Sequence, residues 1–191
     1  MDLIKEYHHV LDKEFCNDII RIYHQSDQIK QGVTFSGLNT SIKKTFDLHF
    51  INIETEKIID YDSKLYLILN KYLNEYLKDF TNLQFEYIDK GFQIQRYIIN
   101  DGFYTYHNDS HVDIQLKEER ILTYIFYLNT VEEGGETEFF GTSKIKAECG
   151  KLVLFPACWC FPHRGLMPIS NDKYIITGWI YRKIYEYEEE N

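Results

Sequence analysis

The sequence contains few proline, glycine and cysteine residues. Only 3 of its 191 residues are proline and 10 are glycine. No stretch has the composition of a linker, a low-complexity tract or a repeat. We expect its cysteines to be free thiols, because a cytosolic compartment keeps thiols reduced. A zinc site made of Cys158, Cys160 and His163 lacks the usual spacing of structural zinc ligands.

Long apolar runs are also missing. No run approaches the roughly 20 residues of a membrane-spanning helix, so we expect no membrane partner. The segment Met1–Glu6 has no secretory apolar stretch with a cleavage site, which predicts a cytoplasmic location. Lysine and arginine number 21 against 30 acidic residues, for a net charge of -9. This balance argues against nucleic acid as a partner, because phosphate binding favours basic surfaces.

Aromatic residues are abundant, at 16% of the chain, and they favour strands and large buried areas. The length suits one domain, residues 1–191. Residues 1–80 read as mainly helical. Asp12 can cap a first helix. A second helix is expected over about Glu54–Leu77, and a break near Asp60–Ser63 is an option.

Residues 81–191 read as short strands rich in Ile, Tyr, Phe and Val, separated by turn residues. The predicted strands are Phe92–Ile99, Ile121–Leu128, Thr137–Phe140, Lys151–Phe155 and Lys173–Tyr181. Helices followed by strands indicate an α+β domain. A β-sandwich or barrel with the N-terminal helices packed on one sheet fits best, because several strands are apolar on both faces.

His107 and Asp109 are two residues apart, so an extended backbone points both side chains to one face. His163, just beyond an apolar strand, is the best third ligand. Two histidines and one carboxylate on one face of a metal leave positions open for oxygen chemistry at iron(II). The pair alone is weak evidence, since His111 and Asp113 form a second copy.

Lys173 follows His163 by ten residues and opens the last predicted strand. On that strand it shares a face with Thr177, Trp179 and Tyr181. A buried lysine needs an anion, and the tail of a dicarboxylate would satisfy it. The alternative is a strand-end lysine that extends to water.

These residues resemble the 2-oxoglutarate and iron(II)-dependent oxygenases, in their prolyl 4-hydroxylase-like branch. The resemblance runs from about Gln93 to Tyr181, and the order and spacing of its pieces are specific. The pieces are Tyr97-x4-Gly102-x-Tyr104-x2-His107-x-Asp109, Tyr127-Leu128-Asn129, Glu133-Gly134-Gly135-Glu136-Thr137, Gly150-Lys151-Leu152-Val153-Leu154-Phe155-Pro156, His163-x9-Lys173 and Thr177-x-Trp179.

The resemblance implies a double-stranded β-helix, a jelly roll closed around the metal. It implies Fe(II), 2-oxoglutarate and O2 as cofactors, and it allows ascorbate as an accessory reductant. The enzyme would hydroxylate a substrate while 2-oxoglutarate is oxidised to succinate and CO2. The implied iron ligands are His107, Asp109 and His163, and the implied 2-oxoglutarate contacts are Lys173, Tyr97, Tyr127 and Thr177.

The spacing of Tyr97 and Tyr104 before His107 favours this histidine over His111. Two places depart from the family pattern. Lys43-Lys44-Thr45 stands where a basic-Ser motif is common, and Gly165-Leu166 stands where a β-branched residue is common.

By the same resemblance, the substrate is a prolyl residue in a peptide or protein. The candidate substrate contacts are Tyr104, Arg164, Trp179 and Tyr181, with ordinary core as the alternative role of Tyr181. The expected lids are Gly32–Asp47 and Ser110–Glu119. One alternative is a hydroxylase of a free amino acid or other small molecule, with Arg164 as its anion clamp. Another is a cupin-like metal-binding or lectin-like jelly roll, which would not need Lys173.

Overall fold

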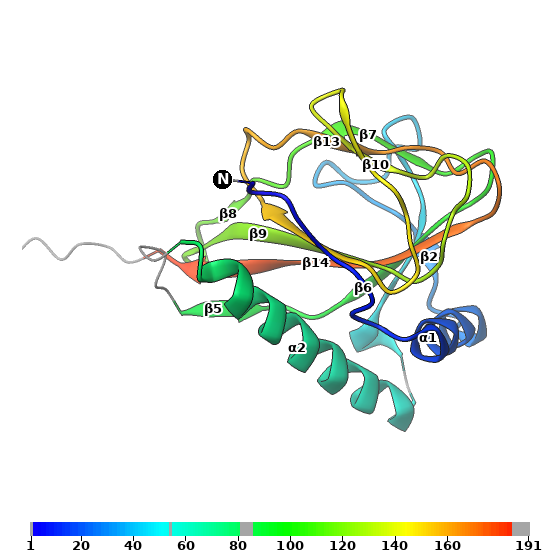
Figure 1. Cartoon of the computed structure of the whole chain (residues 1–191), viewed down its shortest axis with the longest axis horizontal. Coiled ribbons are helices and arrows are strands. Elements are labelled where there is room, and N and C mark those ends of the chain that lie inside the picture. The colour runs from blue at the N-terminus through cyan, green and yellow to red at the C-terminus, as the bar shows by residue number, and fades with distance from the viewer. Residues whose placement is uncertain (1, 54, 81–85, 185–191) are drawn as a thin grey trace, which may run out of the picture.

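The computed structural model describes residues 2–53, 55–80 and 86–184 and has three layers (Figure 1). Two helices, α1 (Lys13–Gln25) and α2 (Glu56–Leu77), cover one face of a large antiparallel sheet. A smaller antiparallel sheet covers the other face. A 3-10 turn, η1 (Phe50–Asn52), leads towards α2.

Within the described residues, the large sheet has nine strands. Its main path is β1 (Lys5–Tyr7), β12 (Leu152–Pro156), β9 (Glu118–Tyr127), β14 (Lys173–Lys183), β6 (Gln93–Tyr97), β4 (Phe46–His49) and β2 (Lys30–Gln31), while β5 (Tyr87–Asp89) pairs with β14 and β8 (Val112–Asp113) with β9. The small sheet has five strands. Their order is β11 (Ser143–Ile145), β10 (Thr137–Phe139), β13 (His163–Gly165), β7 (Phe103–His107) and β3 (Lys43–Lys44).

The helices form where the sequence predicts them. Asp12 caps α1, because its side chain accepts a hydrogen bond of 2.7 Å from the backbone N–H of Phe15. The helix α2 is continuous over 22 residues, so the optional break at Asp60–Ser63 is wrong. Glu54, its expected start, lies outside the described residues. Among the described helices, none combines the length and apolarity that crossing a membrane requires.

The two faces of β9 explain why its sequence is apolar throughout. Tyr124 and Phe126 belong to the core between the large sheet and the helices. Ile125 and Tyr127 belong to a second core between the two sheets. Burial of each such side chain contributes roughly 1.5–3 kcal/mol. The large sheet is therefore the middle layer and is buried on both faces.

The predicted α+β jelly roll is confirmed, and all five predicted strands are present. Residues 1–80 hold both helices, but they also contribute β1, β2, β3 and β4, which were not predicted. The segment Gly32–Asp47, which is expected to act as a lid, contains regular strands as well as a loop. Its second half forms β3 and the start of β4, where Lys43, Thr45 and Asp47 are buried.

Candidate active site

Two neighbouring strands of the small sheet bring the predicted metal ligands together. His107 ends β7 and lies opposite His163 of β13 in the antiparallel register. Asp109 follows β7 by two residues. One ligand atom from each of the three side chains lies within 4.8 Å of the others. Neither His111 nor Asp113 belongs to this group.

Hydrogen bonds turn both histidines towards the same point. The ring Nδ1 atoms of His107 and His163 lie 2.8 Å from the Thr105 carbonyl and 3.0 Å from the Phe161 carbonyl. If these nitrogens carry the protons, both Nε2 lone pairs are free to bind a metal. Burial, together with the neighbouring His163, lowers the pKa of His107 to about 4. The neutral ring is the form that binds metal.

Asp109 is held as a carboxylate beside the two rings. Its oxygens lie 3.9 Å from His107 Nε2 and 3.5 Å from His163 Nε2. The Thr123 hydroxyl donates a 2.8 Å hydrogen bond to Asp109 Oδ2. Burial alone would raise the pKa of Asp109, but the two histidines and Thr123 outweigh it and lower the pKa. The donor set of two imidazoles and one carboxylate fits iron(II).

Lys173 lies deep in the same region, at the start of β14 opposite Tyr97 of β6. Its ammonium is 3.9 Å from the centroid of the Tyr97 ring and donates a 3.0 Å hydrogen bond to the Gly135 carbonyl. The side chain is only 1% exposed, so the alternative that it extends to water is wrong. No carboxylate of the described residues forms an ion pair with it. Burial lowers the pKa of Lys173 to about 7.

The metal-ligand group and Lys173 line one cavity between the two sheets. Its other lining residues are Gln95, Tyr97, Tyr104, Thr123, Ile125, Thr137, Gly165, Ile175, Thr177 and Trp179. A buried cation and a His–Asp–His group on the walls of one cavity fit a dicarboxylate that chelates a metal. The Trp179 indole N–H is buried and has no hydrogen-bond partner among the described residues.

Three predicted site residues do not line this cavity. Arg164 points to the opposite face of β13, where its guanidinium binds the Glu138 carboxylate at 2.8 and 2.7 Å. Tyr127 does not reach the cavity itself, but its hydroxyl lies 2.7 Å from Oγ1 of Thr137, which lines the cavity. A register shift between Ile180 and Tyr181 separates Tyr181 from the cavity-lining residues of β14. The Tyr181 hydroxyl accepts a 3.0 Å hydrogen bond from Nε of Arg120.

Sequence reasoning missed several residues that complete the cavity. Gln95 and Thr123 line it, and each lies two residues from a predicted strand residue on the same face. That period-two pattern could have revealed both. Arg120 was also missed: its guanidinium lies 3.7 Å from the Trp179 ring.

The two departures from the family pattern have physical explanations. A Cβ atom on Gly165 would lie 2.9 Å from Cε1 of Tyr97, so the Tyr97 ring occupies the space of a larger side chain. Lys43 forms a buried ion pair with Asp47 at 2.7 Å, and the Thr45 hydroxyl donates to the same carboxylate at 2.8 Å. Lys43-x-Thr45 thus forms a closed polar group at the edge of the small sheet.

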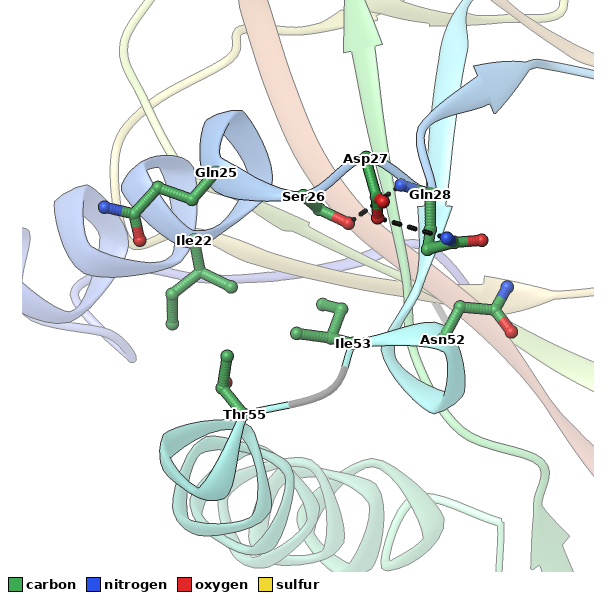
Figure 2. A pocket seen from close by; sticks show the side chains of 8 residues that line it. All are labelled: Ile22, Gln25, Ser26, Asp27, Gln28, Asn52, Ile53 and Thr55. Atoms are coloured by element: carbon green, nitrogen blue, oxygen red, sulfur yellow. Dashed lines mark hydrogen bonds between the residues drawn. The ribbon is translucent and has the colours of Figure 1, made fainter.

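A second pocket lies between the end of α1 and the start of α2 (Figure 2). Its lining residues are Ile22, Gln25, Ser26, Asp27, Gln28, Asn52, Ile53 and Thr55. Histidine, cysteine and basic side chains do not line it, and Gln28 bonds to both Ser26 and Asp27. The pocket has one carboxylate, Asp27, and no imidazole beside it, so the cavity with the His–Asp–His group between the sheets is the candidate active site.

Known proteins support the same assignment. Residues 92–181 match the family model of the 2OG-Fe(II) oxygenase superfamily. No curated protein sequence matches the chain. Among solved structures, the chain is similar to a viral collagen prolyl hydroxylase from Paramecium bursaria Chlorella virus-1, with 22% identity and a TM-score of 0.71 over 95% of this chain and 97% of that one.

Two further structures have the same fold. A Pseudomonas putida prolyl-4-hydroxylase is 17% identical, with a TM-score of 0.70 over 95% of this chain and 93% of that one. A Trichoplax adhaerens prolyl hydroxylase, solved with a peptide fragment of a hypoxia inducible factor, is 15% identical, with a TM-score of 0.72 over 95% and 84%. At these identities the likeness shows the fold.

The matched segment and the His–Asp–His group within it define a domain of the 2OG-Fe(II) oxygenases over residues 92–181. These dioxygenases use Fe(II), 2-oxoglutarate and O2. The alternative of a jelly roll without oxygenase activity is therefore wrong.

Proposed function

We propose that the protein hydroxylates a polypeptide, with a prolyl residue as the preferred target, while 2-oxoglutarate is oxidised to succinate and CO2. The observation that carries the proposal is Lys173, a buried ammonium without a carboxylate partner among the described residues. It shares one cavity with His107, Asp109 and His163. These three residues would hold Fe(II), which supplies the activation of O2 when bound.

Each residue of the cavity has a role in this proposal. The histidines bind the metal through Nε2, and Thr123 holds the Asp109 carboxylate in place through its 2.8 Å hydrogen bond. Lys173 binds the far carboxylate of 2-oxoglutarate, because a charge-assisted hydrogen bond offsets the cost of burying the ammonium. Thr177 lines the same cavity. Tyr127 contributes through Thr137, whose hydroxyl it contacts.

The loops near the metal ligands support a polypeptide as the substrate. Phe35 of the Gly32–Asp47 segment and Ile114 of the Ser110–Glu119 segment are 93% and 84% exposed. The Phe35 ring lies 5.3 Å from the His111 ring, so the two segments meet two residues beyond Asp109. Exposed apolar side chains beside a catalytic cavity are typical of a surface that binds a polymer. The similarity in fold to prolyl hydroxylases supports proline as the target.

The small-molecule alternative has less support. It requires Arg164 to bind the carboxylate of the small molecule. The guanidinium of Arg164 instead forms an ion pair with Glu138 on the outer face of the small sheet. Tyr104, a predicted substrate contact, does line the cavity, and its ring stacks on that of His107 at 3.6 Å. An aromatic ring beside a metal ligand can pack against a substrate ring as well as against 2-oxoglutarate.

The test measures succinate formation and the mass of the candidate substrate in the same reaction. The Fe(II)-loaded protein is incubated with 2-oxoglutarate and either proline-containing peptides or free proline. We expect a peptide to gain one oxygen atom for each succinate formed, and free proline to stay unmodified. His163→Ala should stop both products, whereas His111→Ala, a matched control outside the metal-ligand group, should keep the iron and form succinate in the absence of peptide. Hydroxylation of free proline alone would contradict the proposal.

A further inference from the structure

Two cysteines lie in a tight turn directly before His163. The turn runs from Cys158 to Phe161, and the Phe161 N–H donates a 3.0 Å hydrogen bond to the Cys158 carbonyl. The two sulfur atoms, Cys158 Sγ and Cys160 Sγ, lie 3.0 Å apart. A disulfide bond is about 2.05 Å long, so an approach of roughly 1 Å would join them. Trp159, between them, is 78% exposed.

The two thiols differ in their surroundings. Cys160 is exposed, whereas Cys158 is half-buried and packs against the core between the two sheets. Burial raises the pKa of the Cys158 thiol. An exposed thiol beside a sheltered second thiol is the arrangement of redox-sensing pairs, in which one reacts with the oxidant and the other resolves the product.

The turn is connected to the active site through one carbonyl group. Phe161, its last residue, accepts the hydrogen bond from His163 Nδ1 at 3.0 Å. That bond orients the imidazole of a proposed iron ligand. Shortening the distance between Cys158 and Cys160 would change the backbone of the turn and hence the direction of this carbonyl.

We propose that Cys158 and Cys160 are a reversible dithiol–disulfide pair that lowers the activity of the oxygenase when oxidised. The oxidant is a low-molecular-weight disulfide such as oxidised glutathione. The Cys160 thiolate attacks it, forming a mixed disulfide and releasing one glutathione. Cys158 then attacks the sulfur of Cys160, releasing the second glutathione. The protein thus loses two electrons and two protons, and one oxidised glutathione becomes two reduced ones.

The other two cysteines serve as an internal comparison. Cys16 is fully buried, and Cys149 Sγ donates to the Leu128 carbonyl at 3.4 Å. Both lie in the core between the helices and the large sheet, away from the turn. They should stay reduced under conditions that oxidise the turn, because a mixed disulfide needs an accessible thiol.

The experiment equilibrates the Fe(II)-loaded protein without oxygen in buffers of reduced and oxidised glutathione. Free thiols are then alkylated in acid and mapped by mass spectrometry. We expect a disulfide between Cys158 and Cys160, with Cys16 and Cys149 alkylated. Succinate formation from 2-oxoglutarate, measured in parallel, should fall about tenfold, as when a metal ligand loses its hydrogen-bond partner, and a dithiol reductant should restore it.

Cys160→Ser supplies the matched control. Its activity should equal that of the reduced protein and should not respond to the glutathione ratio. The proposal is overturned if mapping finds both thiols of the turn free or only glutathionylated. It is also overturned if the disulfide forms without loss of activity, or if Cys160→Ser loses activity to the same extent. The thiol map does not depend on which substrate is hydroxylated, so it can fail while the proposed function stands.

Discussion

Lys173 is the one lysine or arginine among the described residues that line the candidate cavity. Lys173 is 1% exposed, and among the described residues the close partners of its ammonium are the Gly135 carbonyl and the Tyr97 ring. Burial of an ammonium without a counter-ion is costly. Such a site favours an anionic ligand, because an anion would offset this cost.

Lys173→Met tests this role directly, since methionine keeps the apolar stem without the charge. We expect the KM for 2-oxoglutarate to rise roughly ten- to hundredfold, because a hydrogen bond to a charged group contributes about 1.5–3 kcal/mol. Steady-state succinate assays measure it. Lys151→Met is the matched control, because Lys151 is equally buried but pairs with Glu6 outside the cavity. An unchanged KM in Lys173→Met would refute the role.

The same lysine predicts how co-substrate binding depends on pH. Burial lowers the pKa of Lys173 to about 7, so the unliganded protein loses this proton as the pH rises above 7. A bound carboxylate favours the charged form, and binding must then take up a proton. The KM for 2-oxoglutarate should therefore rise up to about tenfold per pH unit above 7.

Lys173→Arg is the control for this pH dependence, because a guanidinium stays protonated throughout the range. Its KM should be higher than that of the wild type at pH 7 but nearly constant up to pH 9. Calorimetry in buffers of different ionisation enthalpy measures the proton uptake itself. A wild-type KM that is flat between pH 7 and 9 would show that Lys173 is already charged before binding.

At the scale of elements, the site depends on how β13 packs against β6. His163 and Gly165 share the inner face of β13, and Tyr97 of β6 fills the space beside Gly165. Because a Cβ on Gly165 would meet the Tyr97 ring at 2.9 Å, the glycine and the tyrosine depend on one another. Gly165 stands in place of a β-branched residue because the Tyr97 ring fills the space that such a side chain would occupy.

Gly165→Ala should therefore lower the stability of the protein, and Gly165→Val should lower it further. Overpacking a close-packed interior costs about 1–3 kcal/mol, and valine should cost more than alanine. The KM for 2-oxoglutarate should rise in parallel, because the displaced Tyr97 ring lies under Lys173. Urea unfolding and succinate assays measure the two effects. Loss of stability with an unchanged KM would mean that Tyr97 adjusts without disturbing Lys173.

Elements with a long, clear pattern were predictable, and short ones were not. The stripe of α1 and the apolar runs of β9 and β14 gave correct predictions, whereas β2 and β3 have two residues each, too few for any period. Alternation along β13 already implies that Arg164 points away from His163. The position of Tyr181, in contrast, depends on a register shift that no sequence pattern announces.

At the scale of the whole molecule, each layer has a separate task. The small sheet carries both histidines, and the large sheet carries Lys173, so the site exists only where the two sheets face one another. The helices bury the far face of the large sheet (Figure 1) and take no part in lining the cavity. Under the proposed function, the loops from β2 to β3 and around β8 are the segments that would contact a polypeptide substrate.

The exposed apolar side chains of these loops should therefore matter for polypeptides and not for 2-oxoglutarate. We expect the double variant Phe35→Ser, Ile114→Ser to raise the KM for a peptide substrate about tenfold, since losing two buried apolar contacts removes at least 1.4 kcal/mol. Succinate formation in the absence of peptide should stay unchanged, because neither residue lines the cavity. Ile51→Ser is the matched control, because Ile51 is 92% exposed but lies in a different pocket, beside α2. If the double variant and the control bind peptide equally well, the polymer must approach by another face of the molecule.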